Sequence, residues 1–345
     1  MFRHLYAAVD AAQGKFLHAT TQLQESKATM PTALPGVLAR STIVLFGDSL
    51  TQRGFEPEGW AAALAHYYGR RADVYNRGYG GYNTRWAREL APALFARPPQ
   101  GQAHLLATVW FGANDACIST ERAHVPLLEF EANLETIVQQ ARQVARVVVV
   151  MTPPPVHGPS RLAYQKRKYG AGATGVEERS TEVAGRYGDV AARVAGRHGC
   201  ALLDVHQLML READWPRYVG AGNEEGDGLH LSGAGQRFVA EKLLALLPTL
   251  GLDRDALAYD APWGFEVDAN EPAASLRAHF ARHRGALQAN SGVPGSDREE
   301  SRPLPGAGEP YSYGGVPAGA FLLGVACGVV LLALTRRPRR VRFRN

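Results

Sequence analysis

Five short apolar runs alternate with longer segments of helical composition, and this alternation constrains the fold of the chain more than any other feature. The clearest run is Val147–Met151, four valines and a methionine, which Pro153–Pro155 brings to an end. Runs of this kind, rich in β-branched residues, are typical of strands buried on both faces of a sheet. The other four predicted strands are Thr42–Phe46, Val74–Asn76, Leu105–Phe111 and Ala201–Val205.

Helical composition follows or precedes each of these runs. Strands that alternate with helices favour right-handed βαβ units, which build a parallel sheet with helices on both faces. The sequence therefore predicts an α/β fold, a three-layer α/β/α sandwich around a five-stranded, mostly parallel sheet, in a domain that spans residues 37–250. The predicted helices are Gly59–Tyr68, Thr84–Leu94, Glu129–Ala145, Glu177–His198 and Gly233–Leu247.

The segments on either side of this domain have a different composition. Residues 1–36 are mixed and aperiodic and lack the apolar run of a signal peptide, so we interpret them as a leader, either a transit peptide or a loosely ordered segment. Residues 251–315 are rich in Pro, Gly, Ser and charged residues. We interpret them as a linker with one short helix at Ala273–Leu287.

A membrane helix is predicted near the C-terminus, at residues 316–335. Val316–Leu334 carries no charged residue, and about 19 helical residues span about 28 Å, close to the ~30 Å hydrocarbon core of a bilayer. A buried core helix is the alternative, but it would be unusual between a linker and an arginine-rich tail at 336–345. Because no signal peptide is visible, the expected topology is a single-pass tail anchor with the α/β domain in the cytosol.

Charge and cysteine content exclude several classes of protein. The net charge of +5 depends on six arginines in the last ten residues, without which it would be −1. The body of the chain is therefore not a basic, nucleic-acid-binding surface. Three cysteines without a CxxC pair exclude a disulfide scaffold and a thiolate zinc site. No metal or organic cofactor is expected, because the polar residues considered next could act by nucleophilic catalysis alone.

Polar residues with catalytic potential follow the predicted strands. Ser49 comes directly after the first strand, Gly81 lies in a glycine-rich stretch after the second, and Asn114 follows the third. Asp227 and His230 precede the last helix and are three residues apart. The carboxyl ends of parallel strands meet at one edge of the sheet, where such folds place their sites.

These residue types in this order suit nucleophilic catalysis. A serine needs a base within hydrogen-bond reach, and the base needs an acceptor that orients it. Asp227 could orient His230, and donors at Gly81 and Asn114 could hold an oxyanion. Each residue alone has an ordinary structural explanation, such as a helix cap or a turn; their joint occurrence favours the site. The GxSxG elbow of the α/β-hydrolases is absent around Ser49.

The same blocks resemble the GDSL, or SGNH, hydrolase superfamily, over about residues 43–247. Within this superfamily, the sequence motifs are similar to those of the isoamyl acetate-hydrolysing esterase branch. The blocks that carry the resemblance are Gly47-Asp48-Ser49-Leu50, Asn76-Arg77-Gly78 with Gly81-Tyr82-Asn83-Thr84, Phe111-Gly112-Ala113-Asn114-Asp115, Thr152-Pro153-Pro154-Pro155 and Asp227-Gly228-Leu229-His230-Leu231-Ser232.

The resemblance implies a serine esterase of short acyl esters such as acetates. Ser49 would be the nucleophile, His230 the general base and Asp227 its orienter. The oxyanion hole would consist of the Ser49 N–H, the Gly81 N–H and the Asn114 side chain, with Gly80 as the alternative glycine. Asp48, Tyr82 and Trp86 could line a substrate pocket, although the aromatic pair could equally belong to the core.

Other functions stay open at this stage. The superfamily also contains lipases, thioesterases and carbohydrate deacetylases, and a membrane tether would suit a lipid or otherwise apolar ester. A catalytically silent, membrane-tethered scaffold is an alternative of a different class, against which the intact set of polar residues counts. The oligomeric state does not follow from the sequence.

Overall fold

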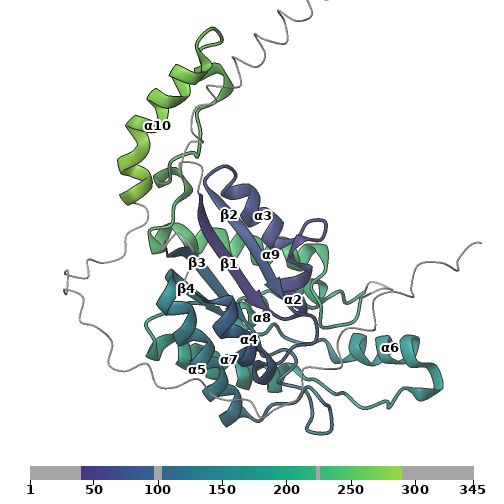
Figure 1. The fold of residues 1–345 in the computed structure, drawn as a ribbon. Helices are drawn as coiled ribbons and strands as arrows, with labels where there is room; N and C mark the ends of the chain where they lie inside the picture. Colours follow the sequence, from purple (N-terminus) through teal and green to yellow (C-terminus); the bar gives the residue numbers. More distant parts are fainter. Residues whose placement is uncertain (1–39, 97–102, 223–225, 290–345) are drawn as a thin grey trace, which may run out of the picture. The chain divides into compact units, whose positions relative to one another are not determined.

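One parallel sheet forms the centre of the protein (Figure 1). The computed structural model describes residues 40–96, 103–222 and 226–289. Within them, the sheet has the strand order β2-β1-β3-β4-β5, and all four pairings are parallel. The predicted five-stranded parallel sheet is therefore confirmed. The strands are β1 (Ser41–Gly47), β2 (Ala72–Gly78), β3 (His104–Trp110), β4 (Ala145–Met151) and β5 (Ala201–Leu203).

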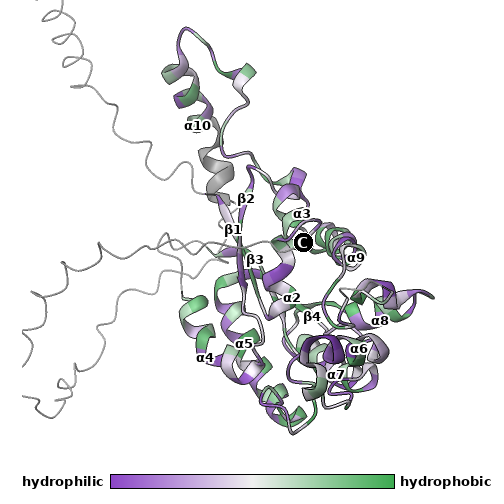
Figure 2. Ribbon diagram, turned by 90° about the vertical axis from the view of Figure 1, so that its right-hand side faces the viewer, coloured by the Kyte–Doolittle hydropathy of each residue, from purple (hydrophilic) through white to green (hydrophobic). Residues whose placement is uncertain are grey.

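Helices cover both faces of the sheet, because successive side chains of each strand point to opposite sides. Ile43 and Leu45 of β1 pack in one apolar cluster, and Val44 and Phe46 pack in the other. The first cluster includes side chains of α3 (Trp60–Tyr67), α8 (Val205–Leu210) and α9 (Gly233–Leu246). The second includes side chains of α4 (Thr84–Leu94), α5 (Leu127–Val144) and α7 (Thr181–Arg197). The three-layer arrangement follows, and Figure 2 shows α4 and α5 on one side of the sheet and α3 and α9 on the other.

Two boundaries differ from the prediction because a polar side chain caps a helix. Ser180 accepts a hydrogen bond from the Val183 N–H, so α7 begins at Thr181 rather than Glu177. Asp204 accepts one from the Gln207 N–H and starts α8, so the last strand ends at Leu203 rather than Val205. Three of the described α-helices were not predicted: the four-residue α2 (Ser49–Gln52), α6 (Gly158–Tyr169) and α8.

Packing against the domain continues beyond residue 250, where the sequence suggested a linker. Leu252 and Leu257 are buried in the first apolar cluster, and the Tyr68 hydroxyl donates to the Leu252 carbonyl at 2.5 Å. The short predicted helix at Ala273–Leu287 corresponds to α10 (Pro272–Ala289). The remaining elements are α2 (Ser49–Gln52) and the 3₁₀ turns at Arg53–Phe55, Gly170–Gly172, Trp215–Val219, Leu247–Leu250, Arg254–Ala256 and Gly264–Glu266.

The predicted leader, membrane segment and arginine tail, residues 1–36, 316–335 and 336–345, lie outside the described residues. Among the helices that are described, none combines the length and the apolar character needed to cross a membrane.

The strand order also determines where a ligand can bind. The direction of strand addition reverses between β1 and β3, which creates a topological switch point at the carboxyl ends of these two strands. The Asp48 N–H, just after β1, lies 3.4 Å from the carbonyl oxygen of Trp110, the last residue of β3. The segments that follow both strands therefore begin side by side, and they carry Ser49 and Asn114.

Candidate active site

Ser49 is the first residue of α2 and stands directly at the end of β1. Asp48 caps this helix, since its Oδ1 accepts a hydrogen bond from the Leu50 N–H at 2.9 Å. Gly47 allows the chain to turn there: a Cβ atom at this position would lie 2.1 Å from Thr51 Oγ1 and 2.7 Å from the Trp110 carbonyl oxygen. The tight strand-to-helix turn thus depends on glycine and presents the Ser49 hydroxyl at the sheet edge.

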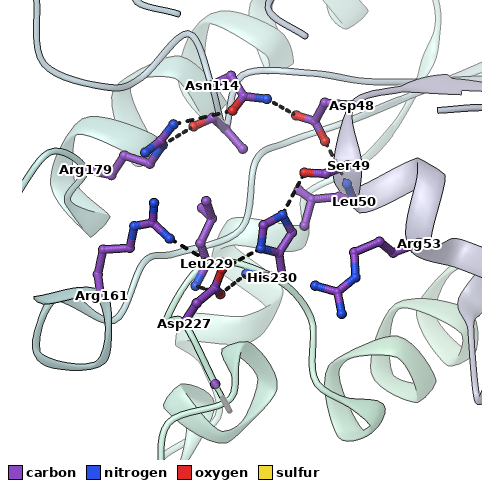
Figure 3. A network of polar contacts seen from close by, with 12 residues as sticks. Asp48, Ser49, Leu50, Arg53, Asn114, Arg161, Arg179, Asp227, Leu229 and His230 are labelled. Carbon is purple, nitrogen blue, oxygen red and sulfur yellow. Dashed lines mark hydrogen bonds and ion pairs between the residues drawn. The ribbon is translucent and has the colours of Figure 1, made fainter. Parts of the chain in front are cut away.

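His230 bridges Ser49 and Asp227 (Figure 3). Its Nε2 lies 2.8 Å from Ser49 Oγ, and its Nδ1 lies 2.6 Å from Asp227 Oδ2. A carboxylate can only accept hydrogen bonds, so Nδ1 carries the ring proton and Nε2 is left to accept the serine proton. The three predicted residues are brought together although Ser49 and His230 are 181 positions apart.

Asp227 is held in place by the turn that it starts. Its Oδ1 accepts hydrogen bonds from the N–H groups of Leu229 and His230, at 3.0 and 2.8 Å. Burial opposes ionisation of Asp227, but the hydrogen bonds and charge of His230 outweigh it and lower the pKa of this carboxyl well below its usual range. Asp227 is therefore a permanent anion beside the imidazole at neutral pH.

The predicted oxyanion donors have different surroundings in the structure. The Ser49 N–H is at the first position of a helix and has no acceptor within that helix. The Asn114 amide nitrogen donates to the Tyr82 carbonyl at 2.9 Å and has a second, longer contact of 3.5 Å with Asp48 Oδ2, and the two contacts fix its orientation. The Gly80 N–H already donates to Gln52 Oε1 at 2.6 Å, whereas Gly81 is exposed with φ of +78°. Of the two glycines, Gly81 is thus the one whose N–H stays available to a ligand.

The three residues considered for a substrate pocket have different surroundings. Asp48 is fully buried, so it supports Ser49 from below and does not offer a surface to a ligand in this structure. Tyr82 packs edge-to-face on Trp86, with ring centroids 5.8 Å apart, and also contacts Tyr79. The aromatic group is half-buried and adjoins the second apolar cluster.

The sequence of this chain matches the family model of the GDSL-like lipase/acylhydrolase family over residues 45–238. The chain belongs to this family. The match begins within β1 and ends within α9, so it contains Ser49, Asn114, Asp227 and His230. Membership makes the protein an ester-bond hydrolase of the GDSL family.

Curated GDSL relatives match over most of their own length. A GDSL esterase/lipase of Arabidopsis thaliana is 37% identical over 246 residues, which cover 69% of this chain and 99% of the relative. A second Arabidopsis thaliana GDSL esterase/lipase is 35% identical, and the match covers 68% of this chain and 96% of the relative. The isoamyl acetate-hydrolyzing esterase 1 homolog of Mus musculus is 36% identical, covering 68% and 91%.

A buried ion-pair cluster supports the site of this GDSL protein and was not predicted from the sequence. Glu178 accepts ion pairs from Arg161 and Arg179, and all three side chains are at most 12% exposed. Arg161 also approaches Asp227 Oδ2 at 3.4 Å, and Arg179 donates to the Ala113 carbonyl at 3.0 Å. These residues lie on α6 and on the loop before α7, where no hydrophobic periodicity or motif singles them out.

Two further carboxyl groups are buried beneath the site. Burial raises the pKa of Asp48 to about 7 and that of Asp115 to about 6. Asp115 accepts hydrogen bonds from the N–H and the hydroxyl of Thr84, at 2.9 and 2.5 Å. In the part of the chain that the structure describes, no group of three or more His, Cys, Asp and Glu side chains could hold a metal ion.

A cavity of about 370 Å³ opens beside His230. Its walls come from the turn after α2, from α6, from the turn that contains Asp227 and His230, and from the start of α9. Most of its lining side chains are polar, among them Arg53, Glu56 and Gln236.

Proposed function

We propose that this GDSL hydrolase cleaves carboxylic esters with short acyl groups, acetates above all, through an acyl-serine intermediate on Ser49. The observation that carries the proposal is the continuous path of hydrogen bonds from Ser49 Oγ through His230 to Asp227, with distances of 2.8 and 2.6 Å. The name of the Mus musculus relative, an isoamyl acetate-hydrolyzing esterase 1 homolog, supports acetate-type esters.

In the proposed reaction, His230 takes the Ser49 proton while Oγ attacks the ester carbonyl carbon. The Ser49 N–H, the Gly81 N–H and the Asn114 amide stabilise the oxyanion of the tetrahedral intermediate. His230 then passes the proton to the departing alcohol oxygen. Water, activated by the same imidazole, hydrolyses the acyl-serine. Asp227 stays ionised throughout and stabilises the imidazolium that forms in each half-reaction.

The alternatives are a lipid-directed lipase or thioesterase, a carbohydrate deacetylase, and a catalytically silent scaffold. A preference for long acyl chains would distinguish a lipase or thioesterase from an acetyl esterase. The complete set of nucleophile, base, orienter and donors argues against the scaffold.

The test compares the full-length protein, purified in detergent, with its Ser49→Ala variant on 4-nitrophenyl acetate, butyrate and palmitate. We expect the wild type to favour acetate and Ser49→Ala to lose nearly all turnover. Preference for palmitate would replace the short-acyl proposal with a lipase. If both proteins showed only the background rate and a fluorophosphonate did not label Ser49, the enzyme proposal would be contradicted. The catalytically silent scaffold would then be the alternative that the result supports.

We also propose that Val316–Leu334 anchors the enzyme in a membrane by a single helix near the C-terminus, with the catalytic domain in the cytosol. The uncharged segment and the six arginines that follow it support this proposal. Alkaline extraction of membranes tests the anchor, with a chain that ends at Gly315 as the control. A glycosylation acceptor site placed after residue 345 tests topology, since its modification would show that the tail reaches the lumen.

A further inference from the structure

The cavity beside His230 occupies a defined side of the reaction centre. Its lining includes His230 and Asp227, but not Ser49, Gly81 or Asn114 among the described residues. A ligand inside it would therefore contact His230 without contacting the predicted oxyanion donors. This placement indicates which part of an ester the cavity receives.

In the proposed reaction, the imidazole gives its proton to the oxygen of the departing alcohol. That oxygen must lie within hydrogen-bond reach of His230 Nε2 in the tetrahedral intermediate. The carbonyl oxygen points the other way, toward Gly81 and Asn114. The group bonded to the departing oxygen consequently extends past His230, into the cavity, while the acyl group does not.

Gln236 places an unused hydrogen-bond donor at the base of this cavity. Its side chain is 3% exposed, and its Oε1 accepts a hydrogen bond from the Trp60 N–H at 3.1 Å. Since a backbone N–H can only donate, this contact assigns the oxygen and the nitrogen of the amide. The Nε2 group then lies on the other side, and it forms no hydrogen bond to any described residue.

Arg53 and Glu56 form a second polar wall. Arg53 Nε lies 3.0 Å from both carboxylate oxygens of Glu56, and its side chain reaches toward His230 (Figure 3). The ion pair holds the guanidinium in place through Nε alone. Its two terminal nitrogens have no hydrogen-bond partner within the described part of the chain, so their N–H groups are available to a ligand.

Together these residues offer several donors and one acceptor, the Glu56 carboxylate. A hydroxyl group both donates and accepts, so it can pair with either kind of partner. A phosphate or carboxylate would face the charges of Glu56 and Asp227, and an apolar alcohol would cover Gln236 Nε2 without offering it an acceptor. Taking about 30 Å³ for each water-sized group, 370 Å³ holds roughly ten to twelve non-hydrogen atoms.

We infer that this cavity binds the alcohol part of the ester and selects an alcohol that carries several hydroxyl groups, such as a polyol or a monosaccharide. Arg53, Glu56 and Gln236 are the specificity-determining residues. This inference rests on the proposed ester hydrolysis, because it uses His230 as the proton donor to the alcohol.

The experiment compares three acetates that form the same acetyl-serine and differ only in the alcohol: glycerol monoacetate, methyl xyloside monoacetate and isoamyl acetate. The full-length wild type should have a higher kcat/KM for the two hydroxylated esters than for isoamyl acetate. Arg53→Met should reduce the ratio of kcat/KM for glycerol monoacetate over isoamyl acetate about ten- to one-hundredfold, the usual effect of losing hydrogen bonds to a charged group.

Arg237→Met is the matched control, because Arg237 forms a similar surface ion pair with Glu58 and does not line the cavity. It should leave the ratio unchanged. Gln236→Glu keeps an acceptor for the Trp60 N–H and removes the donor, so it should lower the ratio as well. Ratios that are the same in wild type, Arg53→Met and Arg237→Met, or a wild type that prefers isoamyl acetate, would overturn the inference. Absence of turnover with every ester, including 4-nitrophenyl acetate, would instead contradict the proposed function.

Discussion

Arg161 Nε lies 2.5 Å from Glu178 Oε1, and the same carboxylate oxygen is 3.1 Å from Arg179 Nη1. Arg161 also contacts Asp227, and Arg179 contacts the loop that carries Asn114, where its Nη2 is 3.4 Å from Asn114 Oδ1. One buried carboxylate thus connects the segment that orients the imidazole with the segment that supplies an oxyanion donor.

Replacing Glu178 by alanine should destabilise the protein by about 3–5 kcal/mol, because two nearly buried guanidinium groups lose their shared partner. Urea unfolding followed by circular dichroism measures the change. Glu182→Ala is the control: Glu182 pairs with Arg186 on the surface, with side chains 79% and 57% exposed, and should contribute ~0.5 kcal/mol or less. Equal losses in the two variants would show that the cluster is not a buried support.

Asp227→Asn should reduce kcat by about 10³–10⁴. The asparagine oxygen can still accept from the Leu229 and His230 N–H groups, so the turn survives. The amide, however, offers a donor to Nδ1 in place of the carboxylate acceptor and favours the wrong tautomer of the imidazole. Steady-state kinetics with 4-nitrophenyl acetate measures the effect, and an unchanged melting temperature confirms the fold. A loss of less than tenfold would contradict the role of Asp227.

Asn114→Ala should reduce kcat by about 10²–10³ with little change in KM, since the amide interacts most strongly with the oxyanion that forms after substrate binds. Both constants come from initial rates over a range of ester concentrations. If KM rose and kcat stayed constant, Asn114 would bind substrate in the ground state instead.

Asp48 should make stability depend on pH. Its pKa is raised to about 7 in the folded protein, from an ordinary value of 3.8, so between about pH 4 and pH 7 the folded state keeps a proton that the unfolded chain has lost. Stability contributed by the neutral carboxyl is therefore present at low pH and lost as pH rises to about 7. Asp48→Asn stays neutral, and Asn can still accept from the Leu50 N–H.

The measurement is the difference in melting temperature between wild type and Asp48→Asn at pH 5 and pH 8. The wild type should lose stability relative to the variant over this interval. Asp115, whose pKa is raised to about 6, is present in both proteins and largely cancels in the difference. A constant difference would mean that Asp48 is ionised at both pH values.

The sequence predicted the central strands β1 and β3 well because they are largely buried. β3 is buried along its whole length, and such a strand has a continuous apolar sequence that is visible without any tertiary information. α6 escaped prediction because it is a polar helix with only Gly158 and Gln165 buried, so it has no apolar stripe. Ser180 and Asp204 moved two element boundaries by capping, an effect that composition alone does not reveal.

The residues of the site likewise fall into a set that the sequence predicted and a set that it did not. Ser49, Asn114, Asp227 and His230 stand in recognisable blocks and could be proposed from the sequence, and the structure places them within one network. Glu178, Arg161 and Arg179 could not, because their importance arises only when α6 folds next to the loop before α7. The available N–H of Gly81, as opposed to Gly80, likewise depends on a contact from Gln52.

The separation of 181 positions between Ser49 and His230 has a consequence for how activity develops. During synthesis the serine leaves the ribosome long before the histidine does, so we expect Ser49 to stay an ordinary alcohol until the segment before α9 has docked beside it. Chains that end before His230 lack the base and should not activate Ser49. Reactivity of Ser49 toward an organophosphorus label reports completion of the last step of assembly, and truncated or misfolded forms cannot produce that signal.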